Sequence, residues 1–256
     1  MRSFLAFTRK EFIRQQRSGK LMLLGILFVL FGIMNPAIAK LTPWLLETMS
    51  DSLAESGMVV TQVTITALDS WVQFFKNIPM ALIAFVLLQG SIFTEEYQSG
   101  SLVLSLTKGL PRYKVVLAKS VTLLVLWTLG YWLCFGVTYG YNAYFWDNAV
   151  AKNLWLSVIC WWVFGVWVIG LVVLLSVSAK SGSTVMTGTG GIVFGCYLLG
   201  TIPKIKEYLP TMLLNGNALI YGTAEADAYT APLIISALLA VLFFSASIPL
   251  FNKNKL

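Results

Sequence analysis

The sequence contains no histidine, which removes the commonest general base of enzymes and the commonest metal ligand. It has no Gly-x-x-x-x-Gly-Lys-Ser/Thr segment, so the chain carries no Walker A loop for ATP. The Gly-x-Ser-x-Gly segment of serine hydrolases and the His-Glu-x-x-His segment of zinc proteases are also absent. These absences argue against an enzyme and against a cofactor or metal held by this chain.

Charged residues are scarce as well, at 11% of the 256 residues, whereas 57% are apolar and the mean hydropathy is +0.78. A soluble domain is about 25% charged and about 45–50% apolar. A soluble fold of this size cannot hide so much apolar surface, so the excess is expected to face lipid. The three cysteines are odd in number, far apart and set in apolar runs, which predicts buried thiols and no disulfide: Cys134, Cys160 and Cys196.

Six charge-free stretches are long enough, or nearly so, for a helix of about 20 residues to cross a bilayer. They are residues 21–39, 77–94, 120–146, 153–179, 181–203 and 228–252. None shows the polar and apolar alternation of a membrane β-barrel, so helices are the remaining solution in lipid. We therefore predict an all-α protein with one transmembrane domain over residues 1–256. It divides into a cytoplasmic interfacial helix at 1–20, a six-span bundle at 21–252 and a cytoplasmic tail at 253–256.

The distribution of lysine and arginine predicts the orientation of these spans. With the N-terminus inside, 13 of the 18 basic residues fall in cytoplasmic segments. We therefore predict a protein of the cytoplasmic membrane whose two termini both lie in the cytoplasm. Residues 1–39 also have the form of a signal peptide ending in Ala37-Ile38-Ala39, but the basic region is long for one. Asn35-Pro36 is explained more simply as the end or a kink of a retained span.

Residues 2–18 have the pattern of a helix that lies on the membrane. Phe4, Leu5 and Phe12 share one side of a helical wheel, and the basic residues share the other. Such a helix binds anionic lipid at about 1 kcal/mol per basic residue. An ordinary basic flank that only sets topology would give the same composition, and the sequence does not separate the two.

The segment between the second and third predicted spans, residues 95–119, has a short apolar element between charged ends. Leu102 and Leu106 belong to this element, and Gly100 marks a turn before it. An apolar element outside the bilayer suits a docking surface for a partner protein. The alternative is an interfacial segment that buries its leucines among lipid headgroups.

In this segment the sequence resembles the type-2 ATP-binding-cassette exporter permeases. Their loop reads Glu-Arg, two residues, Gly-Thr-Leu, then Pro-x-x-Arg nine residues after the glycine and Lys seven after that arginine. The matching positions are Glu96, Gly100, Leu102, Arg112 and Lys119, and the departures are Tyr97, Ser101 and Gly109. Chain length, six spans and a basic N-terminal helix extend the resemblance over the whole chain.

The resemblance implies that this loop is a coupling helix that docks on a separate ATPase subunit. Glu96, Gly100, Leu102, Leu106 and Arg112 are then the candidate ATPase-coupling residues. ATP and magnesium are expected on the partner ATPase only. A second permease copy or a similar permease is expected beside this one, with cargo moving between the two, and the N-terminal helix becomes a connecting helix along the membrane.

The fifth predicted span is rich in glycine. Gly191 and Gly195 form a small-xxx-small pair, which lets two helix backbones approach closely. We interpret the pair as a helix-packing site, within one chain or between two. Ordinary tolerance of glycine in membrane helices would produce the same pattern by chance.

The sequence thus predicts a permease subunit of an ATP-driven exporter, with membrane lipid and no nucleic acid among its partners. A path free of charge suits an amphipathic or hydrophobic cargo, such as a peptide or drug. A membrane assembly or immunity protein without transport is the main alternative. An intramembrane enzyme is disfavoured because no acid or base lies inside a predicted span.

Overall fold

The computed structural model describes residues 2–48, 64–98, 100, 106–107, 109–179 and 181–253, and within them all regular secondary structure is helical. This confirms the predicted all-α class. The longer helices are α1 (Arg2–Arg17), α2 (Lys20–Thr48), α4 (Ala67–Gln89), α7 (Arg112–Phe145), α8 (Leu154–Ser178), α9 (Gly182–Leu199) and α12 (Thr230–Lys253). The short ones are α5 (Thr94–Gln98), η1 (Asn148–Val150), α10 (Pro203–Lys206), η2 (Pro210–Leu214), α11 (Gly216–Ile220) and η3 (Ala226–Tyr229).

Five helical segments of the described chain are long and apolar enough to cross a membrane. They are Lys20–Leu45, Ala67–Gln98, Arg112–Phe145, Leu154–Ser178 and Ala226–Lys253. The predicted span at 181–203 is helical as α9 but is not one of the five, because glycine and threonine lower its mean hydropathy. The structure therefore gives five candidate spans where the sequence predicts six.

Several helices extend beyond the predicted spans. Helix α2 continues past Lys40 to Thr48, α4 begins at Ala67 and not at residue 77, and α7 begins at Arg112 and not at residue 120. A charge-free stretch measures only the apolar part of a span, whereas a helix continues through lysine and aspartate at a cost below about 1 kcal/mol per residue. The helix ends consequently project beyond the apolar stretches, where they carry the polar contacts described below.

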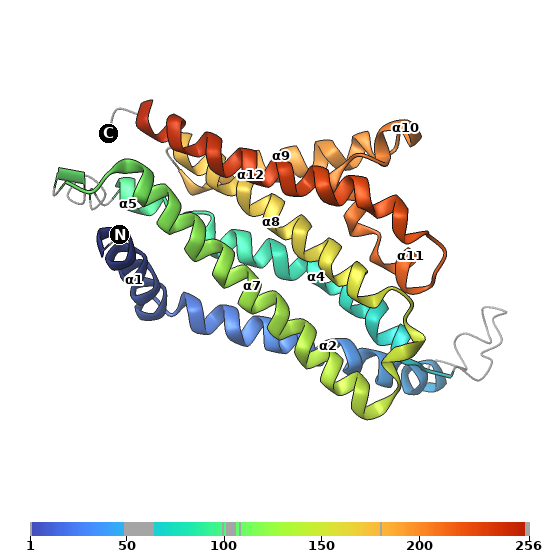
Figure 1. Cartoon of the computed structure of the whole chain (residues 1–256). Coiled ribbons are helices and arrows are strands. Elements are labelled where there is room, and N and C mark those ends of the chain that lie inside the picture. Colours follow the sequence, from blue (N-terminus) through green and yellow to red (C-terminus); the bar gives the residue numbers. More distant parts are fainter. Residues whose placement is uncertain are drawn as a thin grey trace.

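The helices form a bundle in which α8 is the central element, packed against α7, α9, α11 and α12 (Figure 1). A second group, α2, α4 and α7, packs through aromatic rings that include Trp71, Phe74 and Phe135. Gly165 on α8 allows Trp127 to lie against its backbone, since a Cβ there would come within 2.2 Å of the indole. The first and last helices end near each other, so α1, α5, the start of α7 and the end of α12 lie at one end of the bundle (Figure 1).

Candidate functional site

The residues predicted to couple to an ATPase lie around the connection between α4 and α7. Glu96 lies on α5, and Gly100 has a φ of +67°, a left-handed conformation that glycine adopts without strain. Leu106 is half-buried and packs against the hydrophobic core. Leu102 lies outside the described residues, as does most of the predicted coupling helix. The docking element itself therefore stays a prediction, whereas the residues on either side of it have defined positions.

Arg112 begins α7 and ties it to the C-terminal end of α12. Its guanidinium donates hydrogen bonds to the main-chain oxygens of Phe251 and Asn252, each at 3.1 Å. Arg112 thus holds one end of the loop against the last helix.

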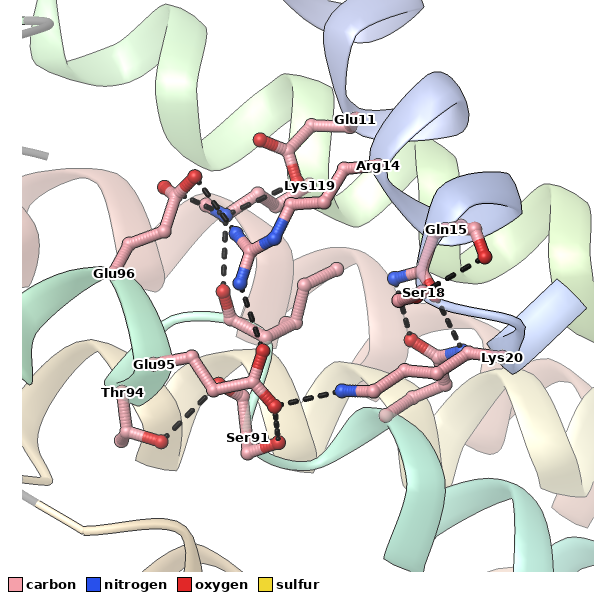
Figure 2. A network of polar contacts seen from close by, with 12 residues as sticks. Glu11, Arg14, Gln15, Ser18, Lys20, Ser91, Thr94, Glu95, Glu96 and Lys119 are labelled. Atoms are coloured by element: carbon pink, nitrogen blue, oxygen red, sulfur yellow. Dashed lines mark hydrogen bonds and ion pairs between the residues drawn. The ribbon is translucent and has the colours of Figure 1, made fainter. Parts of the chain in front are cut away.

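The other end of the loop is held by a buried ion triad. The Nζ of Lys119 on α7 lies 2.9 Å from Oε2 of Glu96 and 3.2 Å from Oε2 of Glu11 on α1 (Figure 2). All three residues are at most 2% exposed. Lys119 also donates to the main-chain oxygen of Ile92 at 2.9 Å. One ammonium group therefore joins α1, α7 and the segment leading into α5.

A second layer of ion pairs surrounds the triad and is more exposed. Arg14 reaches both carboxylates of α5, at 2.8 Å from Oε1 of Glu96 and 2.7 Å from Oε2 of Glu95. Lys10 lies 3.2 Å from Glu96. Lys20, at the start of α2, lies 2.7 Å from Glu95 (Figure 2). We refer to these seven residues together as the ion cluster: Lys10, Glu11, Arg14, Lys20, Glu95, Glu96 and Lys119.

The electrostatics of the cluster centre on two buried carboxylates that share one buried lysine. Burial raises the pKa of Glu11, and the charge of Lys119 opposes that rise without reversing it. Oε1 of Glu11 has no hydrogen-bond partner in the described part of the chain. Removing one member of such a buried network destabilises the protein by more than the intact network stabilises it, because the remaining charges lose their counter-ion. The cluster is therefore sensitive to the loss of Lys119.

A buried amide pair lies beside the cluster and extends it to α4. The side chains of Gln15 and Gln89 exchange two hydrogen bonds, at 2.8 and 3.1 Å. Helix α1 is thus fixed to α4, α5 and α7 by polar contacts at one end of the bundle.

The orientation of α1 in the structure differs from the predicted one. Phe4 and Phe12, predicted to share the membrane-facing side with Leu5, pack against the core, whereas Leu5 is 65% exposed, and the inner face also carries Phe7 and Glu11. Lys10 and Arg14, predicted to share a solvent or lipid face, instead contact the α5 carboxylates. The side of α1 that faces the bundle thus combines aromatic side chains with charged groups that pair with α5.

The sequence motif identifies two members of the triad, Glu96 and Lys119, and the structure brings them together. It does not bring Leu106 or Arg112 into the cluster. Glu11 was missed, although a signal exists, since it is the only acidic residue among the first twenty and lies between basic ones.

The predicted packing glycines on α9 contact nothing in the described chain. A Cβ at Gly191 or Gly195 would have no heavy atom within 4 Å, whereas a Cβ at Gly188 would lie 3.0 Å from Leu175 on α8. The close contact between α8 and α9 thus uses Gly188. Gly191 and Gly195 leave an open surface on the outside of the bundle.

Comparison with known protein families gives one whole-chain match. The family model described as "ABC-2 family transporter protein" matches residues 5–256. The comparison with curated proteins finds no match.

Proposed function

The chain belongs to the ABC-2 family of transporter membrane proteins, and on this premise we propose that it is one permease of an ATP-driven exporter for amphipathic or hydrophobic cargo. Proteins of this family are multi-pass membrane permeases without an ATPase domain, and they work with ABC ATPase subunits. Export, the class of cargo and the roles of individual residues belong to the proposal.

The observation that carries the proposal is the ion cluster on one side of the loop between α4 and α7. Glu95 and Glu96 lie on α5, in the first part of this loop, and Arg112 follows its end. A partner that pushes on this loop acts on a segment tied by charged contacts to α1, α2 and α7. Motion of an ATPase is thereby transmitted to the membrane helices, which is what a permease without its own ATPase requires.

The proposed topology has six spans, with α9 as the fifth. Its 18 residues extend for about 27 Å at 1.5 Å per residue, close to the bilayer core of about 30 Å. Contacts near the two termini support an even number of crossings, because Lys114 on α7 bonds to Ser3 while Arg112 bonds to Phe251. In this arrangement 1–20 and 253–256 are cytoplasmic, 21–252 form the bundle, and residues 1–256 constitute one permease domain.

Cysteine labelling tests the orientation that the function needs. In a variant without native cysteines, single cysteines at Ser52 and Asp227 are expected to react with an impermeant thiol reagent added to intact cells. A cysteine at Ser105 should react only after the cells are opened, because a loop that docks an ABC ATPase must face the cytoplasm. Labelling of Ser105 from outside would contradict the proposed function.

A second permease, of this chain or of a similar one, is proposed to pack against α9. Its open face at Gly191 and Gly195 permits close backbone approach, the geometry by which small residues promote helix association in membranes.

The Gly191→Leu variant should therefore give less dimer in detergent, whereas Gly191→Ala should differ little from the wild type. A Cβ at Gly191 would meet no heavy atom of the described chain within 4 Å, so we expect the melting temperature of the monomer to stay unchanged. Chemical cross-linking followed by size-exclusion chromatography measures the dimer fraction. Equal dimer fractions for the two variants would mean that these glycines face lipid.

A further inference from the structure

A cavity lies where α7 connects to α8, at the opposite end of the bundle from the ion cluster (Figure 1). Its volume of about 560 Å³ falls within the range of about 300–1,000 Å³ that is typical of small-molecule sites. The lining includes Tyr139 on α7, Asp147 and Asn153 in the connection, and Leu154 and Trp155 on α8. The cavity therefore combines a carboxylate, aromatic rings and apolar surface.

The two aromatic rings of the lining are held side by side and remain open to the outside. The ring centroids of Tyr139 and Trp155 lie 6.1 Å apart, with an angle of 40° between the planes. Phe135, which is buried, supports both rings, with its centroid 5.7 Å from that of Tyr139 and 5.2 Å from that of Trp155. Tyr139 is 37% exposed and Trp155 is 56% exposed. The rings are thus fixed by packing and accessible to a ligand.

The position of Asp147 at this cavity is fixed by hydrogen bonds of its own loop. Its Oδ1 accepts a hydrogen bond from the main-chain nitrogen of Ala149 at 2.9 Å. Asn148, the next residue, donates to the main-chain oxygen of Tyr139 at 3.2 Å and accepts from Nε1 of Trp71 at 3.0 Å. Asp147 is exposed, and within the described residues it takes part in no ion pair. Its negative charge is therefore available to a ligand.

The surroundings of Asp147 favour a cation. No basic residue of the described chain lines the cavity. Lys152, which is close in sequence, lies along Gly222 instead, where an added Cβ would come within 2.7 Å of the lysine Cδ. The same end of the bundle already holds one ammonium group on an aromatic ring, because Nζ of Lys40 lies 3.8 Å from the ring centroid of Phe145.

The lining suits an organic cation better than a metal ion. Calcium takes about 6–8 oxygen ligands, whereas this cavity presents one carboxylate among apolar and aromatic groups. The faces of tryptophan and tyrosine attract an ammonium group within about 6 Å of the ring centroid, and quaternary ammonium ligands are bound in this way. Leu154 and Leu156 add apolar surface for the carbon atoms of such a ligand.

We infer that this cavity is a binding site for an organic ammonium group that carries methyl groups on its nitrogen. The rings of Tyr139 and Trp155 contact the methylated nitrogen, and Asp147 supplies the opposite charge. Free small cations and phosphatidylcholine headgroups both carry such a group. The site is separate from the ion cluster, and its occupancy does not depend on an ATPase.

Two matched probes test whether the site reads the charge of its ligand. Choline and 3,3-dimethylbutan-1-ol have the same shape, but a neutral carbon replaces the nitrogen in the second. Each is titrated into the full chain in dodecylmaltoside micelles at constant ionic strength, and saturation-transfer NMR of the methyl signal reports binding after subtraction of the signal with empty micelles. Choline is expected to bind about 5-fold more tightly, the combined size of an exposed cation–ring contact and an exposed ion pair.

Substitutions test the two kinds of contact separately. Asp147→Asn keeps the oxygen that accepts from Ala149 but removes the charge, and Trp155→Leu removes one ring. Each should weaken choline binding by about 3-fold. Asp227→Asn and Trp44→Leu, at exposed positions outside the cavity, are the matched controls and should bind choline as the wild type does. Equal melting temperatures establish that all four variants fold.

The addition of lipid distinguishes the two sources of the ammonium group. Phosphatidylcholine mixed into the micelles should compete with choline if lipid headgroups reach the site, whereas phosphatidylglycerol, which has no ammonium group, should not. Choline binding that is unchanged by phosphatidylcholine would identify a free cation as the ligand. Equal affinity of the wild type for choline and 3,3-dimethylbutan-1-ol, or wild-type affinity for choline in either Asp147→Asn or Trp155→Leu, would overturn the proposal.

Discussion

Replacing Lys119 by methionine is expected to lower the free energy of unfolding by about 3–5 kcal/mol, the range measured when one partner of a buried ion pair is removed. Methionine has a similar length but no charge, so the buried carboxylate of Glu11 loses its ammonium partner, whereas Glu96 keeps its contacts with Lys10 and Arg14. The loss should appear as a lower melting temperature of the purified protein and as faster proteolysis of α1.

A second substitution, which removes a carboxylate, separates the electrostatic effect from simple loss of packing. Adding Glu11→Gln to Lys119→Met removes the buried carboxylate that has lost its ammonium partner and should recover part of the lost stability. Lys253→Met, at an exposed position, should change little. A melting temperature of Lys119→Met equal to that of the wild type, or a further loss on adding Glu11→Gln, would show that the triad is not a coupled unit.

The pKa of Glu11 gives this variant a pH dependence of known sign. Burial raises the pKa of Glu11, so the folded state binds this proton more tightly than the unfolded chain. The contribution is present at low pH and is lost as the pH rises through the pKa of the folded state. With Lys119 absent, the opposing charge is gone, and Lys119→Met should therefore regain stability as the pH falls from neutral to mildly acidic.

The sequence predicts the membrane helices well because charge-free runs of apolar residues have few alternative structures. The sequence predicts less well those contacts that join residues far apart along the chain. Lys119 and Glu11 are separated by 108 positions, and no periodicity within α1 indicates that its acidic residue would face inward.

The predicted orientation of α1 failed for the same reason. Grouping Phe4, Leu5 and Phe12 assumes that burial of apolar surface alone chooses the inner face. Two carboxylates on α5, far away in the sequence, attract Lys10 and Arg14 and leave Leu5 exposed. Local sequence determines whether a segment forms a helix, whereas the face that a short helix buries depends on the elements packed against it.

The second large effect is expected at the docking element of the loop. An interface usually depends on a few buried apolar anchors, and truncating one costs more than 1–2 kcal/mol, roughly 10-fold or more in affinity. Leu102→Ala combined with Leu106→Ala should therefore release the ATPase while the permease still inserts and folds. Glu96→Gln should reduce coupling with a smaller loss of binding, because Glu96 lies in the ion cluster and orders the loop from one side.

The most direct test of the central claim, that this loop receives the ATPase, is the dissociation constant of that complex. The ABC ATPase that co-purifies with the wild-type chain is titrated against wild type, the double alanine variant and Leu129→Ala, whose exposed side chain lies on α7 away from the loop. The expected result is a Kd at least about 10-fold higher for the double variant alone. A wild-type Kd for the double alanine variant would contradict the account.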